Sequence, residues 1–145
     1  MSFRTLPPTW ILTPHSGELA RLLKVSVEEI ERDRFHFASM AAQKFGCLVL
    51  LKGFRTVLAT HENRFAVITS GNAALAKAGT GDVLSGFIGG LLAQGVGSLQ
   101  AAGTGAYFHG RIADEWLRTG KDIKSLMPRD LLAMAPECLT LLSRQ

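Results

Sequence analysis

The sequence predicts an α/β fold in which helices cover a short β-sheet, and it predicts that this fold is one portion of a larger domain. The run Cys47 to Leu51 is apolar without interruption and has the length of a strand covered on both faces. Strands come early in the chain and helices late, whereas an independent doubly wound domain alternates them. A sheet of three or four strands also leaves unpaired edges, which missing chain or another subunit must cover.

Composition narrows the class of protein. The chain has 145 residues, 47% of them hydrophobic and 19% charged, which is typical of one globular domain or a piece of one. Its 16 basic and 12 acidic residues are interspersed, so no nucleic-acid surface is indicated. Cys47 and Cys138 lack metal-ligand spacing and favour a reducing cytoplasm. Without a signal-like start or a long apolar run, neither export nor a membrane partner is expected.

The first elements follow from local signals. A strand is expected at Trp10 to Leu12, followed by a helical spacing of apolar residues over 18–23. Ser26 and Glu29 form a capping-box pattern, which predicts the start of a helix that runs to about Phe45.

The middle and end of the chain change in character. Thr56 to Ala59 and Phe65 to Ile68 flank a turn-like segment and predict a hairpin. A stretch of small residues, Thr69 to Gly81, then leads into three helices, which we expect at Asp82 to Ala93, Gln100 to Leu117, and from Pro128 toward Leu142.

The strongest chemical motif is Gly79-Thr80-Gly81-Asp82 directly before an apolar helix. Glycines let backbone N–H groups approach a ligand, and the helix N-terminus favours an anion such as phosphate. Asp82 would then be the general base that takes a proton from a substrate hydroxyl. The alternative is a plain helix cap. The preceding segment from Gly71 to Ala78, which includes Asn72, is expected to form a long mobile loop.

Two further motifs follow predicted strands, at the edge where open α/β sheets bind ligands. In the first, His15 would contact substrate and Glu18 would help to organise magnesium or water, although both could simply cap a helix. The second is Lys52-Gly53-Phe54-Arg55-Thr56, in which a lysine and a hydroxyl suit a phosphate, although a basic hairpin turn is the alternative. His36, His61 and His109 have no such pattern, and we interpret them as structural or exposed.

Taken together and in order, the segments LTPHSGEL, VLLKGFRTVLA, GNAALAKAGTGDVLSGFIGGLLAQG and AAGTGAYFHG resemble the ADP/ATP-dependent NAD(P)H-hydrate dehydratase family of the ribokinase-like superfamily. The resemblance runs from about Trp10 to Leu142. It implies a three-layer α/β/α sandwich, of which this chain would be the C-terminal portion, since the family's domain is about twice as long.

The resemblance also implies a function, namely repair of the 6S hydrate of NADH or NADPH with ATP or ADP as co-substrate and Mg²⁺ as cofactor. On that basis we expect Asp82 to be catalytic and His15, Asn72 and Asp82 to bind the hydrate. The adenine nucleotide would be bound by two segments, Lys52 to Thr56 and Gly79 to Gly81. We also expect the chain to form a homo-oligomer and to work with an NAD(P)H-hydrate epimerase, which would be either fused to it or a separate protein.

Some features depart from the family and keep alternatives open. Ala73, Ala74, Lys77 and Ala78 replace the usual proline and glycines of the loop, and Ser16 replaces a common proline. One alternative is a small-molecule hydroxyl kinase of the same superfamily, although such kinases tend to carry asparagine where this chain has His15. The other is an inactive nucleotide-binding module that has retained the fold.

Overall fold

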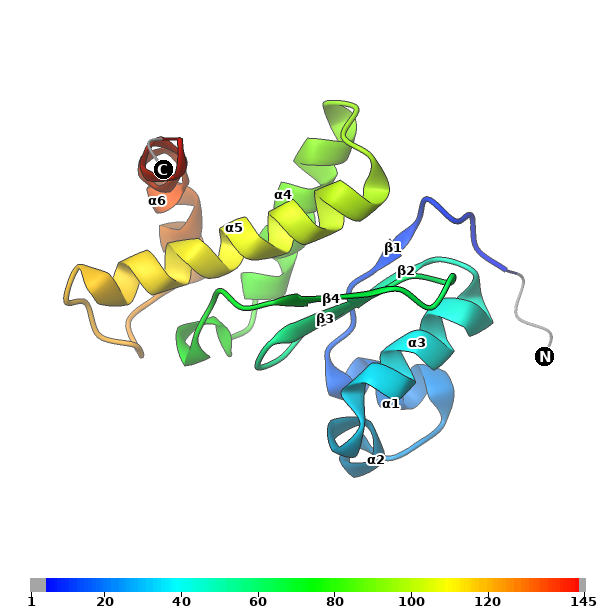
Figure 1. Ribbon diagram of the computed structural model, residues 1–145. Coiled ribbons are helices and arrows are strands. Elements are labelled where there is room, and N and C mark those ends of the chain that lie inside the picture. The colour runs from blue at the N-terminus through cyan, green and yellow to red at the C-terminus, as the bar shows by residue number, and fades with distance from the viewer. Residues whose placement is uncertain (1–4, 144–145) are drawn as a thin grey trace.

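A computed structural model describes residues 5–143 of the chain (Figure 1). Its elements, in order, are β1 (Ile11–Leu12), α1 (Ser16–Leu23), α2 (Val27–Arg32), α3 (Arg34–Phe45), β2 (Leu48–Leu51), β3 (Thr56–Ala59), β4 (Phe65–Ile68), the short 3₁₀ helix η1 (Ala73–Leu75), α4 (Thr80–Ala93), α5 (Ser98–Arg118) and α6 (Pro128–Leu142).

The four strands form one sheet in the order β1-β2-β3-β4. β1 runs parallel to β2, with Leu12 opposite Val49, whereas β2, β3 and β4 are antiparallel neighbours. The predicted hairpin of β3 and β4 is therefore confirmed. Because β1 and β2 are parallel, their carboxyl ends meet at one edge, where the backbone N–H of Lys52 donates to the carbonyl of Pro14 at 2.8 Å.

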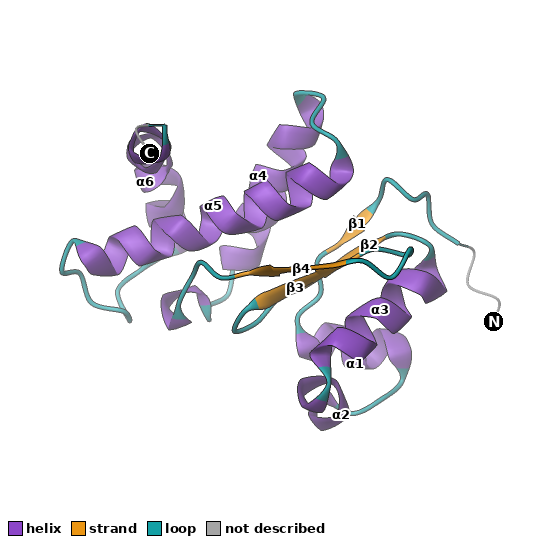
Figure 2. Ribbon diagram, viewed as in Figure 1, coloured by secondary structure: helices purple, strands orange, loops and turns teal. Residues whose placement is uncertain are grey.

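Helices cover both faces of the sheet and give the three layers expected from the sequence (Figure 2). Successive residues of a strand point to opposite faces. Val49 and Leu51 accordingly pack with α1 to α3, while Leu50 packs with α4 and α5 on the other face. All three side chains are fully buried, which explains the unbroken apolar run in the sequence.

The helix predicted from Ser26 to about Phe45 is wrong in its extent. Its capping box is present, with the Glu29 N–H donating to Ser26 Oγ at 3.1 Å, but α2 ends at Arg32. Asp33 leaves the helical conformation and its carboxylate accepts a hydrogen bond from the His36 N–H at 3.0 Å. A short acidic side chain competes for backbone donors in this way, so Asp33 starts a second helix instead of continuing the first.

The later helices occur close to where the sequence predicts them, with α4 and α5 each starting two residues earlier, at Thr80 and Ser98. Gly105 lets α5 pack closely on α4, since a methyl group added there would lie 2.7 Å from the Ile88 side chain. Among residues 5–143, no helix has both the length and the apolar character required to cross a bilayer.

Candidate active site

A cavity of about 920 Å³ lies at the carboxyl ends of β1 and β2, against the N-terminus of α4. Its walls come from three segments far apart in the sequence and from α5. Every site residue that the sequence predicts lines this cavity: His15, Glu18, Lys52, Gly53, Phe54, Arg55, Thr56, Asn72, Gly79, Thr80, Gly81 and Asp82. The topology of the sheet thus brings the three motifs together.

His15 and Glu18 form the capping box that we considered as an alternative. The Glu18 N–H donates to His15 Nδ1 at 3.2 Å, and the His15 N–H donates to Glu18 Oε2 at 2.7 Å. That backbone hydrogen bond and, to a smaller extent, the Lys52 ammonium hold the pKa of Glu18 below its usual value, against the opposing effect of burial. Both side chains remain about half exposed within the cavity wall.

Lys52 links two of the motifs. Its Nζ lies 3.5 Å from Glu18 Oε2. A methyl group added at Gly81 would lie 3.2 Å from the same Nζ. The missing side chain of Gly81 therefore lets the ammonium approach the first turn of α4, where it can contact a bound anion.

The turn after Lys52 presents an aromatic ring at the cavity. Phe54 is 85% exposed, and the Arg55 guanidinium lies 5.6 Å from the centre of its ring. Thr56 Oγ1 donates to the carbonyl of Gly53 at 3.3 Å and closes the turn. An exposed aromatic ring beside a cation is a suitable platform for a planar base.

The first turn of α4 carries unpaired donors. Gly79 is the N-cap, with φ of 86° and no side-chain cap. Within the described part of the chain, no acceptor is found for the backbone N–H groups of Gly81 and Asp82. Thr80 Oγ1 is bound to the carbonyls of Leu75 and Lys77 at 2.7 and 2.8 Å, so its hydroxyl stabilises the turn. Free N–H groups at a helix N-terminus form an anion site.

Asp82 does not cap the helix. Its carboxylate makes no hydrogen bond or ion pair with any residue that the structure describes, although Asp82 lines the cavity. An exposed carboxylate that lines the cavity beside an anion site has the placement required of a general base. The side-chain cap that we considered as the alternative is therefore absent from the described part of the chain, and the catalytic role of Asp82 stays a prediction.

The segment that we expected to be a mobile loop is held at both ends. Asp114 on α5 accepts hydrogen bonds from the Gly71 N–H at 3.0 Å and from Asn72 Nδ2 at 3.1 Å. Asn72 Oδ1 in turn accepts the Ala74 N–H at 3.0 Å, at the start of η1. Lys77 Nζ donates to the carbonyls of Lys124 and Leu126. These contacts give the loop a defined shape over the cavity.

Two cavity or loop residues were not found from the sequence. His109, interpreted as structural or exposed, is buried on α5 and lines the cavity, and its Nε2 has no hydrogen-bond partner among residues 5–143. Burial lowers the pKa of His109 to about 4, with a smaller contribution from the Lys52 charge, so the imidazole is neutral near pH 7. Asp114 holds a loop 42 residues away. No local pattern signals such long-range partners.

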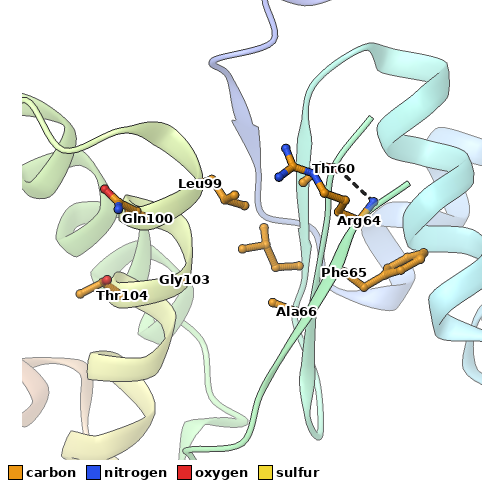
Figure 3. Close-up of a pocket in the computed structure, with 9 residues that line it drawn as sticks. Thr60, Arg64, Phe65, Ala66, Leu99, Gln100, Gly103 and Thr104 are labelled. Carbon is orange, nitrogen blue, oxygen red and sulfur yellow. Dashed lines mark hydrogen bonds between the residues drawn. The ribbon is translucent and has the colours of Figure 1, made fainter. Parts of the chain in front are cut away.

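A second, smaller cavity of about 440 Å³ lies between the β3–β4 hairpin and α5 (Figure 3). Leu99 on α5 faces Ala66 on β4 across it, and Thr60 Oγ1 accepts the Arg64 N–H at 3.1 Å. The Phe65 ring points away from this cavity, toward Phe35 of α3. None of the predicted site residues lines it.

An α/β/α sandwich with a helix N-terminus, a lysine and a carboxylate gathered at one sheet edge places the chain in the ribokinase-like class of folds. The fold agrees, since a ribokinase-like superfamily protein from Enterococcus faecalis matches with a TM-score of 0.73 at 29% identity, over 94% of this chain and 47% of that one. The family model for NAD(P)H-hydrate dehydratase matches residues 4–136. The chain therefore belongs to the NAD(P)H-hydrate dehydratase family.

Individual relatives agree with this assignment. The ADP/ATP-dependent NAD(P)H-hydrate dehydratase from Bacillus subtilis, co-crystallized with ATP/Mg²⁺, matches with a TM-score of 0.89 at 33% identity, over 97% of this chain and 51% of that one. The ADP-dependent (S)-NAD(P)H-hydrate dehydratase of Neisseria meningitidis is 49% identical over 104 residues, which are 72% of this chain and 35% of that protein.

The bifunctional NAD(P)H-hydrate repair enzyme Nnr of Escherichia coli is also 49% identical over 104 residues, which are 72% of this chain and 20% of that enzyme. The chain thus spans about half the length of the solved relatives and a smaller share of these two curated ones.

Proposed function

We propose that this chain carries the nucleotide-binding and catalytic part of an enzyme that uses ATP or ADP to dehydrate the 6S hydrate of NADH or NADPH. One observation carries the proposal: the unpaired carboxylate of Asp82 lies in the same cavity as the unpaired N–H groups of α4 and the ammonium of Lys52. A base and an anion site side by side are the requirements for phosphorylating a hydroxyl.

In this proposal the adenine nucleotide lies between two segments. The unpaired N–H groups of Gly81 and Asp82, together with Lys52, bind the phosphates, and Gly79 and Thr80 shape the turn that presents them. Residues Gly53 to Thr56 bind the nucleoside, with the exposed ring of Phe54 against the base and Arg55 beside it. Because the Thr80 hydroxyl is bound to two carbonyls and its N–H donates to the carbonyl of Lys77 at 3.4 Å, Thr80 acts through its support of the turn.

Asp82 would act as the base. It accepts the proton of the hydrate's hydroxyl while the hydroxyl oxygen bonds to the terminal phosphorus and the bond to the leaving nucleotide breaks. The carbon–oxygen bond then breaks, inorganic phosphate leaves, and loss of a proton from the neighbouring ring carbon restores the double bond. His15, half exposed in the cavity wall, and Asn72, at the start of the loop, contact the hydrate.

The residues fit a magnesium ion that arrives with the nucleotide. In the part of the chain that the structure describes, no three His, Cys, Asp or Glu side chains cluster to hold a metal. Mg²⁺ usually needs only one or two carboxylates besides phosphates and water. Glu18 would hold it through water, since Oε2 already accepts from the His15 N–H. When bound, the ion offsets the negative charge of the phosphates.

The rest of the assembly belongs to the same proposal. The solved relatives are about twice as long, so we propose that this chain is the C-terminal portion of its domain. The remaining wall of the site would then come from a further segment of the same polypeptide or from another subunit. We further propose a homo-oligomer in the cytoplasm that works with an NAD(P)H-hydrate epimerase, since several relatives are named bifunctional repair enzymes. Two buried, unpaired cysteines support a reducing compartment.

The test is recovery of the near-ultraviolet absorbance of the dihydronicotinamide when the protein is incubated with MgCl₂, ATP or ADP, and prepared NADPH hydrate. We expect recovery with the unmodified chain and none with Asp82→Asn. Absence of recovery in a folded sample would contradict dehydratase activity of this chain. Phosphate that remains attached to an added small-molecule alcohol would instead support the kinase alternative.

A further inference from the structure

We propose that Arg34 is a positioning residue, which holds the Lys52–Gly53 turn and the first turn of α1 in a fixed relation to each other. The expected effect of Arg34 on nucleotide binding rests on the proposed function, whereas its expected effect on the order of the two turns does not. Arg34 is the first residue of α3 and does not line the cavity. It therefore acts through residues that do.

The guanidinium of Arg34 connects three segments. Nη2 donates to the carbonyls of Leu51 at 3.0 Å and Lys52 at 3.2 Å, at the carboxyl end of β2. Nη1 donates to Ser16 Oγ at 3.3 Å, at the start of α1. Ser16 follows His15 directly, so one group reaches the neighbours of both cavity motifs. A planar guanidinium with several donors is suited to this task, whereas a lysine is not.

The ionic partner of Arg34 is Glu31, at the end of α2. Nη1 donates to Glu31 Oε1 at 2.9 Å, and the same carboxylate oxygen accepts the Ser16 hydroxyl. The Arg34 side chain is only 13% exposed. A buried charge that is held by a carboxylate and by carbonyl oxygens has one favourable geometry, and that restriction makes it suitable for fixing a turn.

Gly53 is shaped around this guanidinium. A methyl group added at Gly53 would lie 2.6 Å from Arg34 Nη1 and 2.7 Å from Nη2, which is closer than real contacts permit. The guanidinium therefore lies directly against the Gly53 backbone. Glycine at this position is needed for the contact with Arg34 as well as for the approach of a nucleotide.

The first experiment measures amide hydrogen exchange in the unliganded protein, for Arg34→Ala, Arg34→Lys and the control Arg32→Ala. Arg32 is an exposed residue two positions earlier, at the end of α2. We expect exchange to become at least about tenfold faster over residues 52–56 and 15–18 in Arg34→Ala, because lost hydrogen bonds raise the open population. Arg34→Lys should show an intermediate effect and Arg32→Ala none.

The second experiment titrates the same proteins with ATP and MgCl₂ in a calorimeter. If the chain binds nucleotide, Arg34→Ala should raise Kd at least about tenfold, a change of about 1.4 kcal/mol, with partial recovery in Arg34→Lys. Failure of the unmodified chain to bind ATP would count against the proposed function alone. Unchanged exchange at both segments in Arg34→Lys and Arg34→Ala would overturn the positioning role, whatever the titration gives. Should Arg34→Ala fail to fold, unchanged exchange at both segments in Arg34→Lys would by itself overturn the positioning role.

Discussion

Asp114 on α5 binds the side chain of Asn72 at 3.1 Å, although 42 residues separate them in the sequence. The same carboxylate also accepts the N–H of the preceding glycine. One side chain thus fixes the start of the loop that ends at the turn from Gly79 to Asp82. The order of this loop depends on α5 as much as on its own residues.

Replacing Asp114 should therefore loosen the loop. For Asp114→Asn we expect a loss of about 1–3 kcal/mol in the free energy of unfolding, because charge-assisted hydrogen bonds to two donors are removed. KM for the hydrate should rise more than KM for ATP, since the loop start is the proposed hydrate side. Urea unfolding and steady-state kinetics measure both effects. Glu137→Gln, the same change on the exposed face of α6, is the control and should leave both unchanged.

Asp82 should matter for turnover and little for stability. Since the carboxylate has no partner among the described residues, Asp82→Asn removes only its interaction with the helix dipole, about 0.3–1 kcal/mol. Loss of a general base lowers kcat by about 10²–10⁴-fold. The control is Glu28→Gln, which likewise removes a carboxylate charge from the first turn of a helix, in this case α2, outside the site. A variant at Asp82 that retains kcat would contradict the proposed mechanism.

Phe54 should contribute to nucleotide affinity. Because its ring is 85% exposed, Phe54→Ala removes little packing. We expect KM for ATP to rise about 2- to 10-fold, the equivalent of a lost aromatic contact, with an unchanged melting temperature. Phe35→Ala, which removes an exposed ring outside the cavity, is the matched control. Equal KM values for Phe54→Ala and the unmodified protein would exclude the ring as a base platform.

His109 should make stability depend on pH. Burial lowers its pKa from the usual 6.5 to about 4, so the unfolded chain binds more protons than the folded one between these values. Above about pH 6.5 the imidazole is neutral in both states, and its titration does not affect the free energy of unfolding. As the pH falls toward 4, that free energy decreases by up to about 3 kcal/mol. Urea unfolding across this range should show a shallower loss for His109→Gln than for the unmodified protein.

The control for this measurement is His61→Gln, in the exposed turn between β3 and β4. This variant should show the same dependence of the free energy of unfolding on pH as the unmodified protein. Parallel pH profiles for His109→Gln and the unmodified protein would mean that the imidazole does not titrate in this window.

Local chemistry was sufficient to predict most elements. The capping box at Ser26 and the apolar run before Lys52 occur where the sequence places them, because both depend on near neighbours or on simple burial. The break at Asp33 was missed even though aspartate is a strong N-cap, since the apolar spacing on either side resembles one helix. Element ends are sensitive to such single hydrogen bonds.

The sequence by itself determined the kinds of groups present: a glycine-bounded helix start followed by Asp82, a lysine after a buried strand, and an imidazole before a helix. Only the tertiary structure decided which of them meet. Parallel pairing of β1 with β2 brings Glu18 within 3.5 Å of Lys52, and packing of α5 and α3 adds Asp114 and Arg34. Short-range interactions determine helices and turns, whereas contacts across 17 to 43 residues depend on the packing of the whole sheet.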